Sequence, residues 1–414
     1  MPRKNFILAL PLLLISLPLS AGEFHLDNDV IGQVRKNTSS QREIPVNEYF
    51  GMSFSQPSWH LGGETNLREF RDFERKFDEF DLYQTVIHYT PLEALQIDAG
   101  RQFVNQGFFV ETLDGIQTTI APWKYVDFVA YSGIPRSVEM GDFNKNDGLI
   151  TGLSIGSRNL SRTKARIHGA WRKINIRWMD VKHNDEVFVS GNFSHQFAVS
   201  STPMIYGFME YNAAGKVVDV GTAGFDIYPT GKIRLNLEFN YFNTNRQSDR
   251  TTVQALYTAG RMMGGRFSST WTLVSGWLDL IENYSYRNTE VLKNDFRNSH
   301  LADASLRFTA NSIGLSITPG YYYERSFGGH LNGAKTNIHE QFTDKFYADI
   351  LFDFTKYKKI TNNNDNAYSV TGWTGYEVVK GLTLSGGFEY NKNTFFNKDS
   401  RGSFRVDYHF DQGS

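Results

Sequence analysis

The sequence predicts an all-β fold, a single transmembrane antiparallel β-barrel of about 16–20 strands, even in number. Three observations lead to this class. Apolar and polar residues alternate with a period of two over segments of about 9–12 residues, the length of a tilted strand across a bilayer. Aromatic residues form 15% of the 414 residues and cluster near the ends of those segments. Short and long polar links between the segments tend to alternate along the chain.

The first segment has the order of a secretory signal peptide. Pro2-Arg3-Lys4 is a short basic region, residues 6–19 are apolar, and Ser20-Ala21-Gly22 supplies small residues for cleavage. We expect cleavage after Gly22, so that residues 1–22 are a signal peptide and residues 23–414 form the barrel. Such an exported chain is predicted to lie in the outer membrane of a Gram-negative bacterium.

Composition excludes several other classes. A mean hydropathy of −0.41 argues against a bundle of transmembrane helices, which needs several long apolar runs. The chain has no cysteine, which excludes disulfides, thiolate metal sites and covalently attached c-type haem. Without the signal peptide the net charge is about −3, so there is no basic excess for nucleic acid.

The alternation is clearest in three segments. Residues 232–242 place Ile233, Leu235 and Leu237 on one face and Arg234 and Glu238 on the other. Residues 382–390 and 348–354 behave in the same way. Successive side chains of a strand point to opposite faces, so each segment has one apolar and one polar face. Soluble sandwiches also alternate, but their strands are usually about 5–6 residues long, which favours the membrane barrel.

Links between the segments are of two lengths. Prolines fall mostly in the links, where a missing N–H costs no ladder hydrogen bond. The short links are expected at residues 90–92, 121–123, 201–203, 229–231 and 380–381. The long links are expected at residues 134–147, 284–300, 326–337, 358–366 and 391–401. An even strand count requires one more short strand near Ile338–Phe342 that turns at Thr343-Asp344.

The end of the chain carries a more specific pattern. Phe404, Val406, Tyr408 and Phe410 alternate with polar residues. This closing alternation resembles the assembly signal of bacterial outer-membrane barrels, although four polar residues follow Phe410. With the signal peptide, the whole mature chain resembles the porin superfamily, and Gly100-Arg101-Gln102 is similar to a turn-then-strand segment of such barrels. The resemblance implies outer-membrane lipid and the barrel-assembly machinery as partners, and a homotrimer is one expected assembly.

The segment Leu67–Phe80 breaks the period of two. Its apolar residues recur at helical spacing, and Asp72 and Lys76 are four residues apart. A short amphipathic helix in the lumen is one interpretation. A charged hairpin is the favoured interpretation, because no clear helix cap flanks the segment.

The polar face of each strand supplies the residues that line a lumen. Both signs of charge occur there, which predicts a transverse field rather than strong selection for anions or cations. The alternative is that these residues are solvated wall residues, paired across strands. The predicted pore-lining residues are Arg234, Glu238, Arg307, Asp349, Asp353, Glu389, Arg405 and Asp407.

Evidence for a metal site or for catalysis is weak. Asp142, Asn144, Asn146 and Asp147 offer oxygen ligands for Ca²⁺, but the EF-hand register fails and a polar loop with an Asp-Gly turn is favoured. The ten histidines show no pair at metal-binding spacing. The motifs of hydrolases and phosphate-binding loops are missing, so the sequence predicts neither an enzyme nor a cofactor.

The function predicted from these features is that of a porin, which lets small hydrophilic solutes diffuse through a water-filled lumen. The alternative belongs to another class. Some porin-like barrels act as sleeves for multihaem cytochromes that carry electrons across the outer membrane. Without cysteine, this chain would then be the scaffold and the cytochromes would be separate chains.

Overall fold

The computed structural model describes residues 22–36, 41–106, 109–136, 148–173, 185–243, 261–292, 294–326, 329–359, 364–393 and 398–413. Residues 1–21 of the expected signal peptide lie outside this part of the chain. The candidate calcium ligands Asp142, Asn144, Asn146 and Asp147 also lie outside it.

The described chain consists almost entirely of antiparallel strands. The strands are β1 (Glu23–Lys36), β2 (Arg42–Glu43), β3 (Pro45–Gln56), β4 (Leu61–Asp72), β5 (Phe77–Leu92), β6 (Leu95–Gln106), β7 (Phe109–Trp123), β8 (Val126–Pro135), β9 (Leu149–Ser157), β10 (Thr163–Lys173), β11 (Asp185–Gln196), β12 (Met204–Asn212), β13 (Val217–Thr230), β14 (Ile233–Asn243), β15 (Arg261–Val274), β16 (Leu278–Leu292), β17 (Asp295–Ala310), β18 (Leu315–Ser326), β19 (Gly329–Thr343), β20 (Phe346–Lys359), β21 (Asn364–Val379), β22 (Leu382–Lys392) and β23 (Asp399–Gly413). Two single 3₁₀ turns, η1 (Pro57–Trp59) and η2 (Asn311–Ile313), connect β3 to β4 and β17 to β18.

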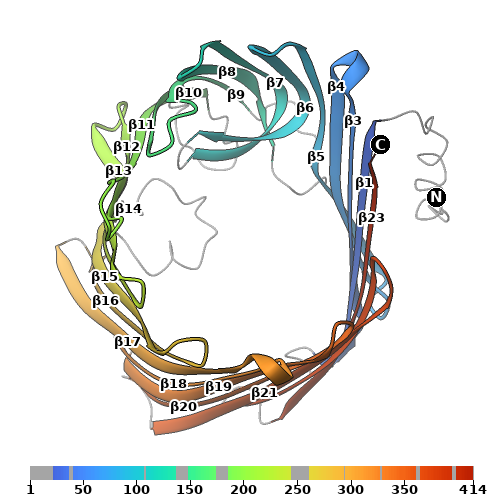
Figure 1. Ribbon diagram of the computed structural model, residues 1–414, viewed down its shortest axis with the longest axis vertical. Helices are drawn as coiled ribbons and strands as arrows, with labels where there is room; N and C mark the ends of the chain where they lie inside the picture. The colour runs from blue at the N-terminus through green and yellow to red at the C-terminus, as the bar shows by residue number, and fades with distance from the viewer. Residues whose placement is uncertain are drawn as a thin grey trace.

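The first strand closes the sheet into a barrel (Figure 1). β1 pairs with β3 from Glu23↔Ser55 to Gly32↔Val46, and with β23 from Glu23↔Gly413 to Val34↔Gly402. β2 pairs only with β1, over two residues, and adds no strand to the wall. The other 22 of the 23 strands each pair with their neighbours in chain order. The antiparallel barrel and its even strand number are confirmed, and the count exceeds the expected range by two.

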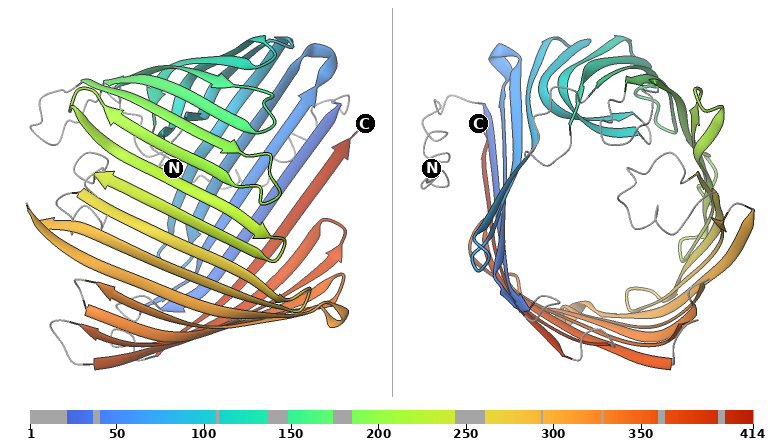
Figure 2. Two further views of the ribbon diagram at one scale, coloured as in Figure 1. Left: turned by 60° about the vertical axis from the view of Figure 1, so that its left-hand side comes forward. Right: turned by 180° about the vertical axis from the view of Figure 1, so that it is seen from behind.

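The two ends of the barrel differ in their connections. Glu23 and Gly413 lie at the same end as tight turns such as Gly231-Lys232, Asp344-Lys345 and Lys380-Gly381. At the opposite end, β8, β10 and β14 finish at Pro135, Lys173 and Asn243, and the next strands begin only at Leu149, Asp185 and Arg261. Figure 2 shows the strands inclined to the barrel axis, as closure of a sheet requires. The predicted alternation of short and long links is therefore present, with corrections.

Two of the expected long links are wrong. Residues 284–300 belong to β16 and β17, which pair up to Leu292↔Asp295. Residues 326–337 belong mostly to β19, which pairs with β18 from Ser326↔Gly329 onward. Their polar residues alternate on one face of a strand instead of forming a loop. The extra strand expected near Ile338–Phe342 is confirmed as part of β19, and the chain turns directly after it.

The segment Leu67–Phe80 forms a β-hairpin, as favoured, and the helical interpretation is wrong. β4 ends at Asp72 and β5 begins at Phe77. The Asp72 carboxylate accepts hydrogen bonds from the backbone N–H groups of Glu74 (3.0 Å) and Arg75 (3.3 Å). These two hydrogen bonds hold the tight turn between β4 and β5.

Candidate pore

The strand register places the wall residues on two faces of different chemistry. On β14, Leu237 lies between its partners Phe225 and Phe267 and is 59% exposed. The next residue, Glu238, lies between Gly224 and Arg266 on the other face. A barrel in a bilayer turns its apolar face to lipid, so the polar face encloses the lumen. Further exposed apolar residues on the face of Leu237 include Ile87, Leu153, Ile205, Phe352 and Phe388.

All eight predicted pore-lining residues lie on the polar face, and each has a partner. The closest nitrogen–oxygen or oxygen–oxygen contacts are Arg234 with Asp226 (2.8 Å), Glu238 with Tyr206 (2.9 Å), Arg307 with Asp279 (2.8 Å), Asp349 with His339 (2.8 Å), Asp353 with Tyr322 (2.8 Å), Glu389 with Asn391, and Arg405 with Asp407 (2.8 Å) and Asp29 (2.9 Å). Glu389 also lies 3.9 Å from Arg401. The structure thus agrees with the interpretation of paired wall residues. A role of any one of them in selection stays a prediction.

The pairing sets the electrostatics of this face. Arg234 donates from Nε (3.2 Å) and Nη2 (2.8 Å) to the two oxygens of Asp226 on the neighbouring strand. Arg307 donates from Nε (3.2 Å) and Nη2 (2.8 Å) to one oxygen of Asp279, Oδ2. Each of these two arginines is therefore compensated by a carboxylate a few ångströms away, which weakens the field that a passing ion meets there.

One part of the wall departs from the regular barrel. Figures 1 and 2 show the teal strands between β6 and β9 curving into the interior. β6 pairs with β5 only as far as Thr85↔Arg101, whereas its pairing with β7 continues to Gln106↔Phe109. The outer part of the β6–β7 hairpin therefore leaves β5 at Arg101.

Gly100 and Arg101 form this branch point. Gly100 has φ +128°, and a Cβ there would lie 2.2 Å from the carbonyl oxygen of Thr85, so only glycine fits. Arg101 is 8% exposed and donates to the carbonyl oxygen of Leu82 on β5 (3.0 Å). It also donates to both oxygens of Asp114 on β7, and Arg136 donates to the same carboxylate (2.8 Å). The arginine thus ties the departing hairpin back to the wall.

The inward curve itself passes through a pair of facing glycines. Gly115 and Gly133 are cross-strand partners on β7 and β8. A Cβ on Gly115 would lie 2.7 Å from the Cα of Gly133, and one on Gly133 would lie 2.8 Å from the Cα of Gly115. Side chains at this pair would hold the two strands apart, so the close approach depends on glycine.

A small apolar core lies on the concave side of the curve. Val104, Leu113 and Ile150 are fully buried, and Tyr131 is 3% exposed. Elsewhere in the described wall the lumen face is mostly half-buried. Because these side chains come from β6, β7, β8 and β9, one from each, their burial holds the curved strands together. The sequence carried a signal for it, because β9 has apolar residues on both faces, as at Leu149 and Ile150.

At four places on the polar face, the side chain of one tyrosine spans three adjacent strands. In each case the ring covers the glycine that is its cross-strand partner, and the hydroxyl reaches the strand beyond. Tyr206 lies over Gly224 and donates to Glu238 (2.9 Å). The other sets are Tyr131, Gly152 and His168 (2.8 Å), Tyr322, Gly333 and Asp353 (2.8 Å), and Tyr347, Gly375 and Ser385 (3.5 Å). These tyrosines line the lumen, whereas the sequence predicted aromatic residues chiefly at the membrane interfaces.

The closing residues of the chain lie on the apolar face. Phe404, Val406, Tyr408 and Phe410 belong to β23, and the Phe404 ring covers Gly32 of β1. Polar residues after Phe410 still belong to the sheet, because Asp411–Gly413 pair with Glu23–His25. This explains the departure from the family pattern: the last strand continues to the end of the described chain.

Comparison with known proteins supports the fold. The chain matched no protein-family model and no curated protein. Its structure is similar to that of a mutant of the ferric enterobactin receptor PfeA from Pseudomonas aeruginosa, with a TM-score of 0.61, 9% identity, and coverage of 94% of this chain and 81% of the receptor. OccK3 (OpdO) of the same species gives a TM-score of 0.44 at 8% identity over 94% and 96% of the two chains. Acinetobacter baumannii OccAB3 gives 0.45 at 10% identity over 94% and 99%.

The similarity to the receptor concerns the fold, since the sequences are almost unrelated. The protein has the closed β-barrel fold of an outer-membrane protein. Within the described residues, no helix is long and apolar enough to cross a membrane.

Proposed function

We propose that this barrel is a channel in the outer membrane of a Gram-negative bacterium, through which small hydrophilic solutes diffuse passively. The observation that carries the proposal is the closed ring of 22 strands whose inner side is polar apart from the small apolar core of β6–β9. Strands about 4.8 Å apart and tilted by about 40° enclose a ring roughly 40 Å across. Such a ring has room for water after its wall side chains are placed.

The inward-curving strands β6–β9 would set the narrowest part of this channel. Their buried core and the Arg101–Asp114 contact hold these strands in place, so the narrow part of the channel has a fixed structure. The paired charges around the lumen favour weak selection between cations and anions. The channel contributes a pore and a field, and no chemical step is assigned to any residue.

Conductance across a planar lipid bilayer tests the proposal. Purified protein whose gel migration is heat-modifiable, and which is therefore a folded barrel, should insert in discrete steps of equal conductance. A folded barrel that inserts without conducting would overturn the proposal. If such a silent barrel also co-purified with haem-staining protein, the sleeve for multihaem cytochromes would take its place.

The route to the membrane is part of the same proposal. Residues 1–22 would direct export and be removed, and the apolar stripe of β23 would be read by the barrel-assembly machinery. The exposed apolar face would then contact outer-membrane lipid. Edman sequencing of the mature protein should begin at Glu23, and a start at Met1 would contradict cleavage.

A further inference from the structure

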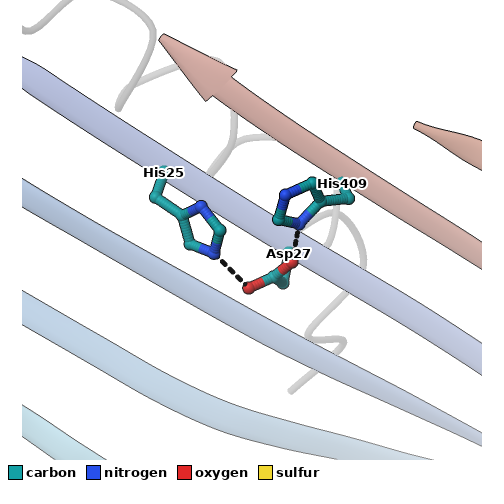
Figure 3. Close-up of side chains that lie close together, drawn as sticks. All are labelled: His25, Asp27 and His409. Carbon is teal, nitrogen blue, oxygen red and sulfur yellow. Dashed lines mark hydrogen bonds and ion pairs between the residues drawn. The ribbon is translucent and has the colours of Figure 1, made fainter. Parts of the chain in front are cut away.

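Two histidines and two aspartates meet where the barrel closes. β1 and β23 pair so that His25 lies opposite Asp411 and Asp27 lies opposite His409. Residues at i and i+2 of a strand share a face, so the four side chains form a square in which His and Asp alternate. Figure 3 shows His25 and His409 on either side of Asp27. The square lies on the polar face, at the barrel end where Glu23 pairs with Gly413.

Every imidazole nitrogen in this square faces a carboxylate oxygen. The His25 Nε2 atom is 2.7 Å from Asp27, and its Nδ1 atom contacts Asp411. The His409 Nδ1 atom is 2.5 Å from Asp27, and its Nε2 atom is 2.6 Å from Asp411. The two rings are 4.6 Å apart at their centroids.

Neutral imidazoles cannot satisfy this arrangement. A neutral imidazole donates one hydrogen bond and offers one lone pair, while an ionised carboxylate only accepts. In the neutral state, two of the four contacts would bring a nitrogen lone pair against a carboxylate oxygen. The square therefore requires extra positive charge at its centre, either as two more protons or as a metal ion.

The ligand atoms match a transition metal of the zinc class. One ligand atom from each of His25, Asp27 and His409 can be chosen so that all three lie within 4.8 Å of one another. Zn²⁺ binds imidazole nitrogen at about 2.0–2.1 Å and carboxylate oxygen at about 2.0–2.2 Å, usually in a tetrahedron. An ion could take these three ligands and a water molecule as the fourth, while the Asp411 carboxylate lies beside both imidazoles. Ca²⁺ and Mg²⁺ prefer oxygen ligands alone, so two imidazoles select against them.

We propose that His25, Asp27 and His409, with Asp411 beside them, form a binding site for Zn²⁺ or a similar divalent transition metal, which links the first and last strands of the barrel. Binding of Zn²⁺ replaces the two additional protons that the four side chains otherwise need. The affinity for Zn²⁺ therefore falls on acidification. Because the ion joins β1 to β23, it stabilises the closed barrel against opening at this seam. The separation of His25 and His409 along the chain explains why spacing alone did not reveal the site.

Titration of the purified barrel with ZnCl₂ tests the site. The protein is the mature chain without a polyhistidine tag, folded in detergent and freed of metal by a chelator. We expect one saturable Zn²⁺ site per barrel at neutral pH, lost at about pH 5 where imidazole is protonated. Co²⁺ should give the visible absorption bands of a tetrahedral complex. Absence of saturable binding in the folded protein would overturn the proposal.

Variants locate the binding. His25→Ala and His409→Ala should each weaken Zn²⁺ binding by roughly tenfold or more. The matched control is His339→Ala, which removes a lumen-facing histidine that contacts one carboxylate, Asp349, at 2.8 Å. Its binding should equal that of the wild type. Unchanged affinity in both His25→Ala and His409→Ala would place the ion elsewhere and overturn the site.

An isosteric variant separates loss of the site from loss of the fold. Asp27→Asn preserves the size of the side chain but removes its charge, and it should also weaken binding. Heat-modifiable migration confirms folding of each variant. Zn²⁺ should raise the temperature at which the wild-type barrel loses its compact migration, and it should leave His409→Ala unchanged. An equal rise in both would show that the ion does not act at this seam.

Discussion

Arg101 holds Asp114 with two parallel hydrogen bonds, from Nε to Oδ1 (2.7 Å) and from Nη2 to Oδ2 (3.0 Å). The pair lies where β6 separates from β5. A fork of this kind fixes both the distance and the orientation of the two strands. The arginine's third hydrogen bond reaches a carbonyl oxygen that the departing strand no longer pairs, so one side chain joins the wall to the inward-curving segment.

The first prediction concerns this contact. Arg101→Ala should lower the free energy of unfolding by about 2 kcal/mol, since the arginine is buried while Asp114 is partly exposed. The β6–β7 hairpin should then lose its fixed position, and single-channel conductance should rise or become noisy. Urea unfolding in detergent and bilayer recording measure the two effects.

Arg307→Ala is the matched control for this variant. It removes an exposed arginine that also donates from Nε and Nη2 to a carboxylate, here to the single oxygen Oδ2 of Asp279. Its cost should stay below about 1 kcal/mol, with steady conductance. Equal effects of the two substitutions would contradict a special role of Arg101.

The second prediction concerns the tyrosines whose rings cover a glycine on the neighbouring strand. A Cβ on Gly224 would lie 2.1 Å from the ring of Tyr206, so Gly224→Ala must displace that ring and break its hydrogen bond to Glu238. We expect a loss of about 1–3 kcal/mol in unfolding free energy. Gly402→Ala is the control, because a Cβ there meets no atom within 4 Å. A stable Gly224→Ala barrel would show that the ring moves without cost.

The sequence predicts the wall well because its signal is local. The period of two over residues 232–242 matches β14, and its two faces match the two faces of the barrel. Errors arise where polar residues dominate, as in residues 326–337, because the lumen side of a strand and a surface loop have similar compositions.

The inward curve and the proposed metal site could not be predicted in this way. The close approach of Gly115 to Gly133, and of His25 to His409, depends on which strands pair and in which register. Neither pairing has a signature in the composition or spacing of a single segment. The tyrosine bridges depend on register for the same reason.

The third prediction tests the stripe on the last strand. Phe410→Ala should reduce the amount of folded barrel in the outer membrane, because it alters the stripe proposed as the assembly signal. It should have little effect on folding into detergent, where that signal is not read. Phe388→Ala on β22 is the control, since its ring is also exposed on the apolar face. Equal loss of both proteins from the membrane would point to general destabilisation.

The fourth prediction concerns charge selection. Asp226→Asn keeps the shape of the side chain but leaves Arg234 without its ion pair, so the lumen gains an uncompensated positive charge. The reversal potential in a KCl gradient should shift toward anion preference, while the wild-type channel stays near neutrality. Asp344→Asn makes the same change of net charge in the β19–β20 turn, outside the wall, and should shift the potential much less.

If both variants shift the reversal potential equally, the net charge of the protein rather than the ion pairs in the lumen controls the selection between anions and cations. If Asp226→Asn has no effect, Arg234 does not face the path of the ions.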